Sequence, residues 1–596
     1  MSAAAPSTTT TTASPWRTGV IGAVALLAAG IGLAAGAFLM TSRTAAIGAG
    51  AAYVPADAVF YVEMRLEPSA AQDAALRDFL GAFPAIEGLD LERPLSDQLA
   101  ERLDEMLADE GASVTWADDV APWFDGRVAL AVPELPAELL AVPPIDSLDP
   151  ETPFPTSATE PPVVVMLGVT DRAAAAAAID RIVAEAGQSI SFEETTHAGV
   201  TVNVMRGDEP GAWALVDDQL LFAPSAEEVN AAIDAHADPS ATLAEAQHLA
   251  ALNAQLPADW LAFVTYDMTE LVAASWDQMA TMAPEMSDAF DSLLDQPLRG
   301  AMALTAGADR LALDVASDAP TGPLAVANTD RGLAGEVPAD TLFFAEGGNI
   351  GASLAAVIGP IKEAAAATPE GAEQVAMIEA ALGADLEELV SWIDHGALAL
   401  GWGGTEPYGG LVLVPSDADA AARRLGQLGT FASLASMDPS SGISVENREV
   451  AGSTVTTIRW EDPSAASPGV TVFAMPVATG VTVEYTVTDD RALVGIGEGF
   501  VERVLTLDGG SLADEPRYRD AIADLGGASN AGATWLDLTG MREAIEAVAQ
   551  PQLDEMDTDG AYERDILPWL EPLDRLVQVS VLEGYLLVKR SSLLVE

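Results

Sequence analysis

Several phrases of the sequence occur twice in the same order, and this repetition constrains the fold more than any other feature. Val-Pro-Ala-Asp begins at Val54 and returns at Val337, 283 residues later. Further matching pairs follow in order: WFDGRVALAV from Trp123 with WIDHGALALG from Trp392, and HAGVTVNVM from His197 with VAGSTVTTI from Val450. A period of this length is far above the roughly 20–50 residues of solenoid repeats, so it indicates two tandem copies of one domain-sized unit.

Each copy is predicted to be α+β. Runs such as AVFYVEMR from Ala58 are rich in β-branched and aromatic residues and predict strands, whereas apolar residues recur at helical spacing in 71–84 and 95–107. Around Tyr485 apolar residues alternate with polar ones such as Glu484, which predicts one buried and one solvent-facing side. Strands joined by short turns, with helices inserted, favour a mostly antiparallel sheet.

The repeats and the composition together set the predicted boundaries. We expect a disordered tail, a transmembrane helix, a linker, the first α+β copy, a second linker and the second α+β copy. Their residues are, in that order, 1–18, 19–40, 41–52, 53–318, 319–336 and 337–596.

An uncharged apolar run covers Gly19–Met40. At about 1.5 Å per residue, its length suits a hydrocarbon layer of about 30 Å. A cleaved signal peptide is the alternative, but its apolar stretch is usually only about 7–15 residues long. Arg17 and Arg43 flank the run on either side. We therefore expect a single-pass membrane protein whose C-terminal region is extracytoplasmic, because a short N-terminal tail usually stays inside.

Gly32 and Gly36 form a Gly-x-x-x-Gly pair within this run. Such a pair lets two membrane helices approach closely, so a homodimer through these glycines is one open alternative. Frequent glycine in membrane helices explains the same pair without any dimer.

The formal net charge is −64, from 91 acidic and 27 basic residues. Nucleic acid binding needs clusters of Lys and Arg, so nucleic acid is not an expected partner. The charge attracts cations and basic partners, although solubility alone accounts for it as well. The chain has no cysteine, which excludes disulfides, thiolate catalysis and cysteine-ligated metals.

No residue pattern predicts a catalytic, metal or cofactor site. The four histidines show no zinc-ligand spacing, and the Asp-Asp pairs lack the pattern of a calcium loop. Gly495, Gly497 and Gly499 only partly match a dinucleotide fingerprint. The histidines are His197, His236, His248 and His395, and the pairs begin at Asp118, Asp217 and Asp489. We interpret the histidines as surface or turn residues and the Asp-Asp pairs as turn formers.

The phrase VPADAVFYVEMRLEPSAAQDAALRDFLGAFP, followed by WADDVAPWFDGRVALAV, resembles a bacterial family known as domain of unknown function 3352. The resemblance covers most of residues 53–596. It implies a single-span membrane protein with a large extracytoplasmic α+β region, and it brings no catalytic residue with it.

Three functions stay open at this point. The first is a non-catalytic binding or scaffold ectodomain at the cell envelope, with a protein or a lipid as its partner. The second is a carrier of an apolar ligand, which requires a pocket above roughly 300 Å³ lined by apolar side chains. The third is an envelope enzyme, which requires two buried carboxylates facing each other in a cleft.

Overall fold

The structure is a computed structural model. It describes residues 48–86, 88–109, 114–134, 162–186, 191–206, 211–273, 296, 298–366, 368–403, 407–438, 441–460, 481–556 and 560–596. Within these ranges no helix is both long and apolar enough to cross a membrane. The predicted membrane helix, residues 19–40, lies outside the described residues.

The first half of the chain contributes ten strands to the sheet. They are β1 (Phe60–Arg65), β2 (Phe124–Val132), β3 (Val164–Val169), β4 (Ser191–His197), β5 (Val200–Arg206), β6 (Gly211–Val216), β7 (Gln219–Ala223), β8 (Ala262–Asp267), β9 (Arg299–Gly307) and β10 (Arg310–Asp318). Its main helices are α2 (Ala70–Gly81), α3 (Leu95–Asp109), α5 (Arg172–Ala186), α6 (Ala226–Ala237) and α7 (Gln247–Asn253). A short 3₁₀ helix, η1 (Ala49–Tyr53), precedes β1.

The second half contributes ten more strands. They are β12 (Thr341–Gly348), β13 (Ile393–Trp402), β14 (Pro407–Pro415), β15 (Ile443–Val450), β16 (Ser453–Trp460), β17 (Val481–Val487), β18 (Ala492–Ile496), β20 (Gly532–Asp537), β21 (Leu573–Glu583) and β22 (Leu586–Val595). Its helices are α10 (Ile350–Ala366), α11 (Pro369–Leu382), α12 (Ala418–Ala435), α13 (Phe500–Thr506), α14 (Pro516–Leu525), α15 (Leu538–Met556) and α16 (Leu567–Leu570).

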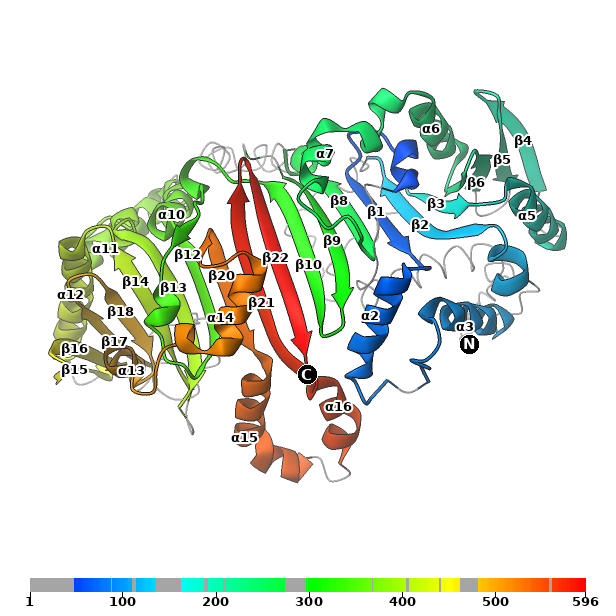
Figure 1. The fold of residues 1–596 in the computed structure, drawn as a ribbon. Helices are drawn as coiled ribbons and strands as arrows, with labels where there is room; N and C mark the ends of the chain where they lie inside the picture. Colours follow the sequence, from blue (N-terminus) through cyan, green and yellow to red (C-terminus); the bar gives the residue numbers. More distant parts are fainter. Residues whose placement is uncertain are drawn as a thin grey trace, which may run out of the picture.

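All twenty strands belong to one antiparallel sheet, which curves across the whole molecule (Figure 1). Strand pairing follows the order β4-β5-β6-β7-β3-β2-β1-β8-β9-β10 in the first half. The second half follows β15-β16-β17-β18-β14-β13-β12-β20-β21-β22. The fold is therefore α+β with a large antiparallel sheet, and each strand of one half has a counterpart in the other.

The last strands of the halves, β10 and β22, join the two halves into one sheet. They pair antiparallel from Arg310 opposite Leu594 to Asp318 opposite Leu586. In Figure 1 these strands lie side by side at the centre of the molecule, with the first half on the right and the second on the left.

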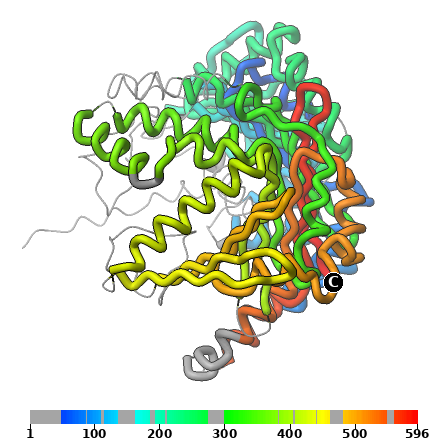
Figure 2. Tube along the Cα trace, turned by 90° about the vertical axis from the view of Figure 1, so that its left-hand side faces the viewer, coloured from blue at the N-terminus to red at the C-terminus, as the bar shows by residue number. Residues whose placement is uncertain are grey.

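Helices cover both faces of the sheet. On β2, Ala129 packs in a core with α6 and α7, whereas its neighbour Val128 packs in a separate core with α5. Neighbouring strand residues point to opposite faces, so these cores lie on opposite sides. The second half repeats this arrangement, with α13 and α14 in one core and α12 in another. Figure 2 shows α10, α11 and α12 together at the end of the second half.

One sequence prediction about the sheet is wrong. The polar side of β17 was expected to face solvent, but Glu484 and Thr486 are 1 % and 2 % exposed. Tyr485 packs with α12 on one face, while the Gly499 N–H at the start of α13 donates to Glu484 Oε2 (3.0 Å) on the other. An alternation of apolar and polar residues therefore predicts a solvent-exposed face only where no helix packs on the polar side of the strand.

Both predicted linkers contain ordered segments. Residues 49–52 of the first belong to η1, where Ala51 is fully buried. In the second, Thr329–Asp330 pairs with Ser529–Asn530, and Leu333 is fully buried. These segments are therefore packed against the halves that they connect.

Candidate functional site

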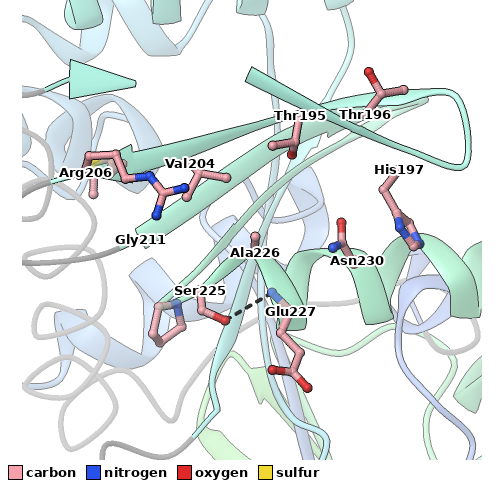
Figure 3. A pocket seen from close by; sticks show the side chains of 12 residues that line it. Thr195, Thr196, His197, Val204, Arg206, Gly211, Ser225, Ala226, Glu227 and Asn230 are labelled. Atoms are coloured by element: carbon pink, nitrogen blue, oxygen red, sulfur yellow. Dashed lines mark hydrogen bonds between the residues drawn. The ribbon is translucent and has the colours of Figure 1, made fainter. Parts of the chain in front are cut away.

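A pocket of about 520 Å³ lies in the first half, between the β4–β5 hairpin and the start of α6. Its size falls within the range of about 300–1,000 Å³ typical of small-molecule sites. Figure 3 shows Arg206 at one end, His197 and Asn230 toward the other, and Ala226 between them. Charged and amide groups line the pocket together with the apolar side chains of Val204 and Met205, so its lining is mixed.

Arg206 is the main cation of the pocket. Its Nε and Nη2 atoms both donate to Glu193 Oε2 on the neighbouring strand, at 2.9 and 2.5 Å. The Arg206 side chain is 61 % exposed, so one edge of its guanidinium can bind another partner.

The opposite wall comes from the first turns of α6. Ser225 caps this helix by accepting from the Glu227 N–H at 3.1 Å, and Glu227 itself is exposed. Asn230 lies one turn further, and its Oδ1 atom is buried without a hydrogen-bond partner in the described part of the chain. At the far end His197 Nε2 lies 2.7 Å from Asp234 Oδ1.

The second half has the same framework at this place. The β4–β5 turn has Ala198 and Gly199 at φ 46° and 86°, and the β15–β16 turn has Ala451 and Gly452 at 49° and 86°. The register agrees too, since Asn203 lies opposite Trp213 and Thr456 opposite Tyr485. Positions in the two hairpins can therefore be compared residue by residue.

At the positions of the pocket, the second half holds a network of ion pairs. Arg459 stands at the place of Arg206, and its Nε and Nη1 atoms donate to Glu498 (2.7 Å) and Glu446 (3.0 Å). Arg448 bridges Glu484 (3.0 Å) and Glu502 (2.6 Å).

The first half keeps one arginine and replaces the other long side chains with shorter ones. The corresponding residues, first half before second, are Thr195 and Arg448, Ala212 and Glu484, Ala226 and Glu498, and Asn230 and Glu502. The pocket thus occupies the space that ion pairs fill in the second half.

A glutamate recurs on the first strand of each half; Glu63 is buried and Glu346 is half-buried. Glu63 lies opposite Phe263 on β8, and Glu346 lies opposite Ala533 on β20, at equivalent points of the two sheets. Glu63 is 1 % exposed, and a Cβ at Gly48 would overlap its carboxylate, so a larger residue at position 48 would displace that carboxylate. Tyr61 donates its hydroxyl to Glu63 Oε2 at 2.5 Å.

Burial raises the pKa of both glutamates. Burial raises the pKa of Glu63, while Tyr61 and Arg127 oppose the shift. Burial also raises the pKa of Glu346 to about 7, against the opposing charge of Arg331. Each carboxylate has one buried oxygen without a hydrogen-bond partner in the described part, which is consistent with the loss of hydration.

The raised pKa of Glu346 predicts a stability that depends on pH. Because the folded protein holds the proton more tightly, this contribution is complete below pH 4.5 and is lost as the pH rises through 7. Between pH 5 and 8 the wild type should lose about 2–3 kcal/mol more unfolding free energy than Glu346→Gln. Urea unfolding at several pH values measures this difference. Glu363→Gln, at an exposed position of α10, should keep the wild-type profile, and an unchanged profile in Glu346→Gln would contradict the assignment.

Of the residues that the sequence singled out, the structure brings Asp217 and His236 together, and it places His197 in the pocket. Gly32 and Gly36 lie outside the described residues. Asp217 and Asp218 form the β6–β7 turn, where Asp217 contacts His236 (3.1 Å) and Asp218 accepts from the Tyr53 hydroxyl (3.1 Å). Among the described residues no group of three or more His, Asp or Glu side chains is placed to hold a metal ion.

Sequence reasoning named His197 but missed the other residues of the pocket, and it also missed Glu63 and Glu346. Arg206 and Arg459 end matching hairpins, so a comparison of charges between the aligned copies would have singled them out. Nothing local in the sequence marks Glu63, because its burial depends on strands and a 3₁₀ helix from elsewhere in the chain.

The geometry bears on the three functions. The lining of this pocket is only partly apolar, whereas a carrier of an apolar ligand needs an apolar lining. Glu63 and Glu346 lie on strands with six others between them, about 30 Å apart at the usual strand spacing. The carboxylates of Glu63 and Glu346 therefore do not face each other across a cleft.

Comparison with known proteins gives one match. The profile of a family described as protein of unknown function (DUF3352) matches residues 20–561, which is most of the chain. Neither a curated protein nor a solved structure matches.

Proposed function

The chain belongs to the DUF3352 family, and from this premise we propose that it is a non-catalytic binding ectodomain at the cell envelope. In this proposal one N-terminal helix holds the protein in the membrane. The rest is two tandem copies of one unit, of which the first carries the binding site.

The observation behind the proposal is the difference between the halves at one place in the fold. The second half fills this place with the ion pairs of Arg459 and Arg448, while the first half leaves a pocket beside Arg206. Since the frameworks are otherwise alike, the pocket is not required by the fold. A pocket that the fold does not need, lined by a few polar groups, is typical of a ligand site.

The other two functions have less support. An apolar carrier would need a lining unlike that of the described pocket. An enzyme using carboxylates would need two of them in one cleft, and Glu63 and Glu346, whose pKa values are raised, lie far apart in the sheet. A protein partner at the envelope remains compatible with the proposal.

Labelling of single cysteines tests the proposed location, and the absence of native cysteine gives a clean background. Ala422→Cys, at an exposed position of α12, should react with a membrane-impermeant maleimide in intact cells. Thr9→Cys, in the N-terminal tail, should react only after permeabilisation. If Ala422→Cys also needs permeabilisation, the extracytoplasmic placement is wrong.

A neighbouring residue provides the matched control. Ala421 is fully buried on the same helix, so Ala421→Cys should stay unlabelled until the protein is denatured. Crosslinking in intact cells followed by mass spectrometry then tests binding itself. Recovery of a lipid alone would favour the carrier over the proposed ectodomain.

A further inference from the structure

We propose that the pocket beside Arg206 binds a zwitterion, namely a free amino acid or a short peptide with both termini free. This inference rests on the proposed function and names the ligand class of the same site. Two features of the pocket support this proposal, namely a partly free guanidinium and hydrogen-bond acceptors on the opposite wall. The net charge of the whole chain is the third argument.

The carboxylate of the ligand is assigned to Arg206. In the second half Glu498 supplies a carboxylate to the Nε atom of Arg459 at 2.7 Å, in addition to Glu446. In the first half Ala226 stands at the place of Glu498, so the side chain that would bring this second carboxylate is missing. Because Glu193 already accepts from the Nε and Nη2 atoms of Arg206, a ligand carboxylate in the pocket would bind the remaining Nη1 side of the guanidinium. Arginine is well suited to it, because its planar fork can bind two carboxylates along different edges.

The ammonium group of the ligand is assigned to the opposite wall. Glu227 is exposed at the pocket, and the buried Oδ1 atom of Asn230 has no hydrogen-bond partner in the described part of the chain. Both are acceptors, and a buried acceptor without a partner is stabilised by an incoming N–H donor. An ammonium group in the pocket can bind the exposed Glu227 carboxylate, and it can bind Asn230 Oδ1 once the amide turns toward the pocket.

The net charge of the chain favours a zwitterion over a simple anion as the ligand. With a net charge of −64, the surface repels a free anion approaching the pocket. A zwitterion carries no net charge, so it reaches Arg206 without this barrier. A pocket of about 520 Å³ also has room for more than a single small amino acid, which extends the class to short peptides.

The test is the binding of defined probes to the purified full chain. The common amino acids, dialanine and trialanine are screened by thermal shift, and binders are measured by calorimetry. Capping the carboxylate of a binder as its amide, or acetylating its amine, should weaken binding at least about tenfold, as expected when one charged hydrogen-bonded group is lost. Equal binding of the capped forms would overturn the zwitterion assignment.

Two variants locate the site. Arg206→Ala should weaken binding at least about tenfold, because it removes the only assigned carboxylate partner. Ala226→Glu rebuilds the second-half arrangement, so its own carboxylate should occupy Arg206 and prevent binding. An acidic residue in the first turn of a helix is favourable, so this variant should keep the wild-type melting temperature or exceed it. If position 226 had only a structural role, Ala226→Glu would not abolish binding while leaving the melting temperature unchanged.

Arg459→Ala is the matched control in the second half, and it should leave the affinity unchanged. If no probe binds the wild type, the ligand class is wrong, whereas cysteine labelling and crosslinking still decide the proposed function. If a probe binds but neither Arg206→Ala nor Ala226→Glu weakens it, the pocket is not its site.

Discussion

Proline in place of Ala316 is expected to destabilise the protein by roughly 3 kcal/mol or more and to loosen the junction between its halves. Ala316 is fully buried on β10, where it lies opposite Ala301 on β9 and Val588 on β22. Proline has no N–H, so it removes a hydrogen bond from one of the two ladders, and its ring has no room between packed strands. Urea unfolding measures the loss, and limited proteolysis should show faster cleavage between the halves.

The same substitution outside the sheet provides the control. Ala327 is exposed in the connection between the halves, so Ala327→Pro should change the unfolding midpoint little. Equal midpoints for Ala316→Pro and the wild type would mean that β10 does not hold the two halves together.

Replacement of Trp260 by alanine is expected to cost about 3–5 kcal/mol of unfolding free energy. Trp260 is fully buried and is the largest such side chain in the described residues. Its ring lies 5.6 Å from that of Phe263, and the guanidinium of Arg65 lies 4.6 Å above it. Alanine would leave a large cavity and remove the surface on which the arginine lies.

Trp260→Phe separates packing from hydrogen bonding. The indole N–H has no hydrogen-bond partner in the described part of the chain, so phenylalanine loses volume but no hydrogen bond. Trp260→Phe should lower the unfolding free energy clearly less than Trp260→Ala does. Trp569→Ala, at a position that is 47 % exposed, should cost less than about 1 kcal/mol. Similar losses for Trp260→Ala and Trp569→Ala would contradict the role assigned to Trp260.

Local features of the fold follow from the sequence. The Val-Pro-Ala-Asp phrase predicts a turn before a strand, because proline fixes φ near −65° and aspartate can bond to its own backbone two residues on. In both halves the turn closes with an N–H donated to the proline carbonyl, from Ala58 to Pro55 and from Thr341 to Pro338, each at 3.1 Å. Asp267 accepts from the Thr269 N–H (3.0 Å), as expected of a residue that caps a helix start.

Features that depend on contacts between distant parts of the chain could not be predicted from the local sequence. The strand β4 (Ser191–His197) was missed because it is rich in polar residues, and an edge strand needs no apolar alternation. The burial of Glu484 depends on α13, which follows in the chain but packs on a face that the local pattern marks as polar. The pocket was missed because it arises from side-chain lengths on separate strands and a helix, at Thr195, Arg206 and Asn230.

The junction between β10 and β22 has a consequence for the history and handling of this protein. The first residue of β10 lies near the end of β22, the last residue of β10 lies opposite the first of β22, and Asp314 faces Arg590 midway. Such a self-complementary seam is the kind that two identical subunits form around a two-fold axis. A chain of this kind can arise when the gene of a symmetric dimer fuses end to end. If the two halves separate, β10 and β22 become unpaired sheet edges that can pair with another copy and begin aggregation.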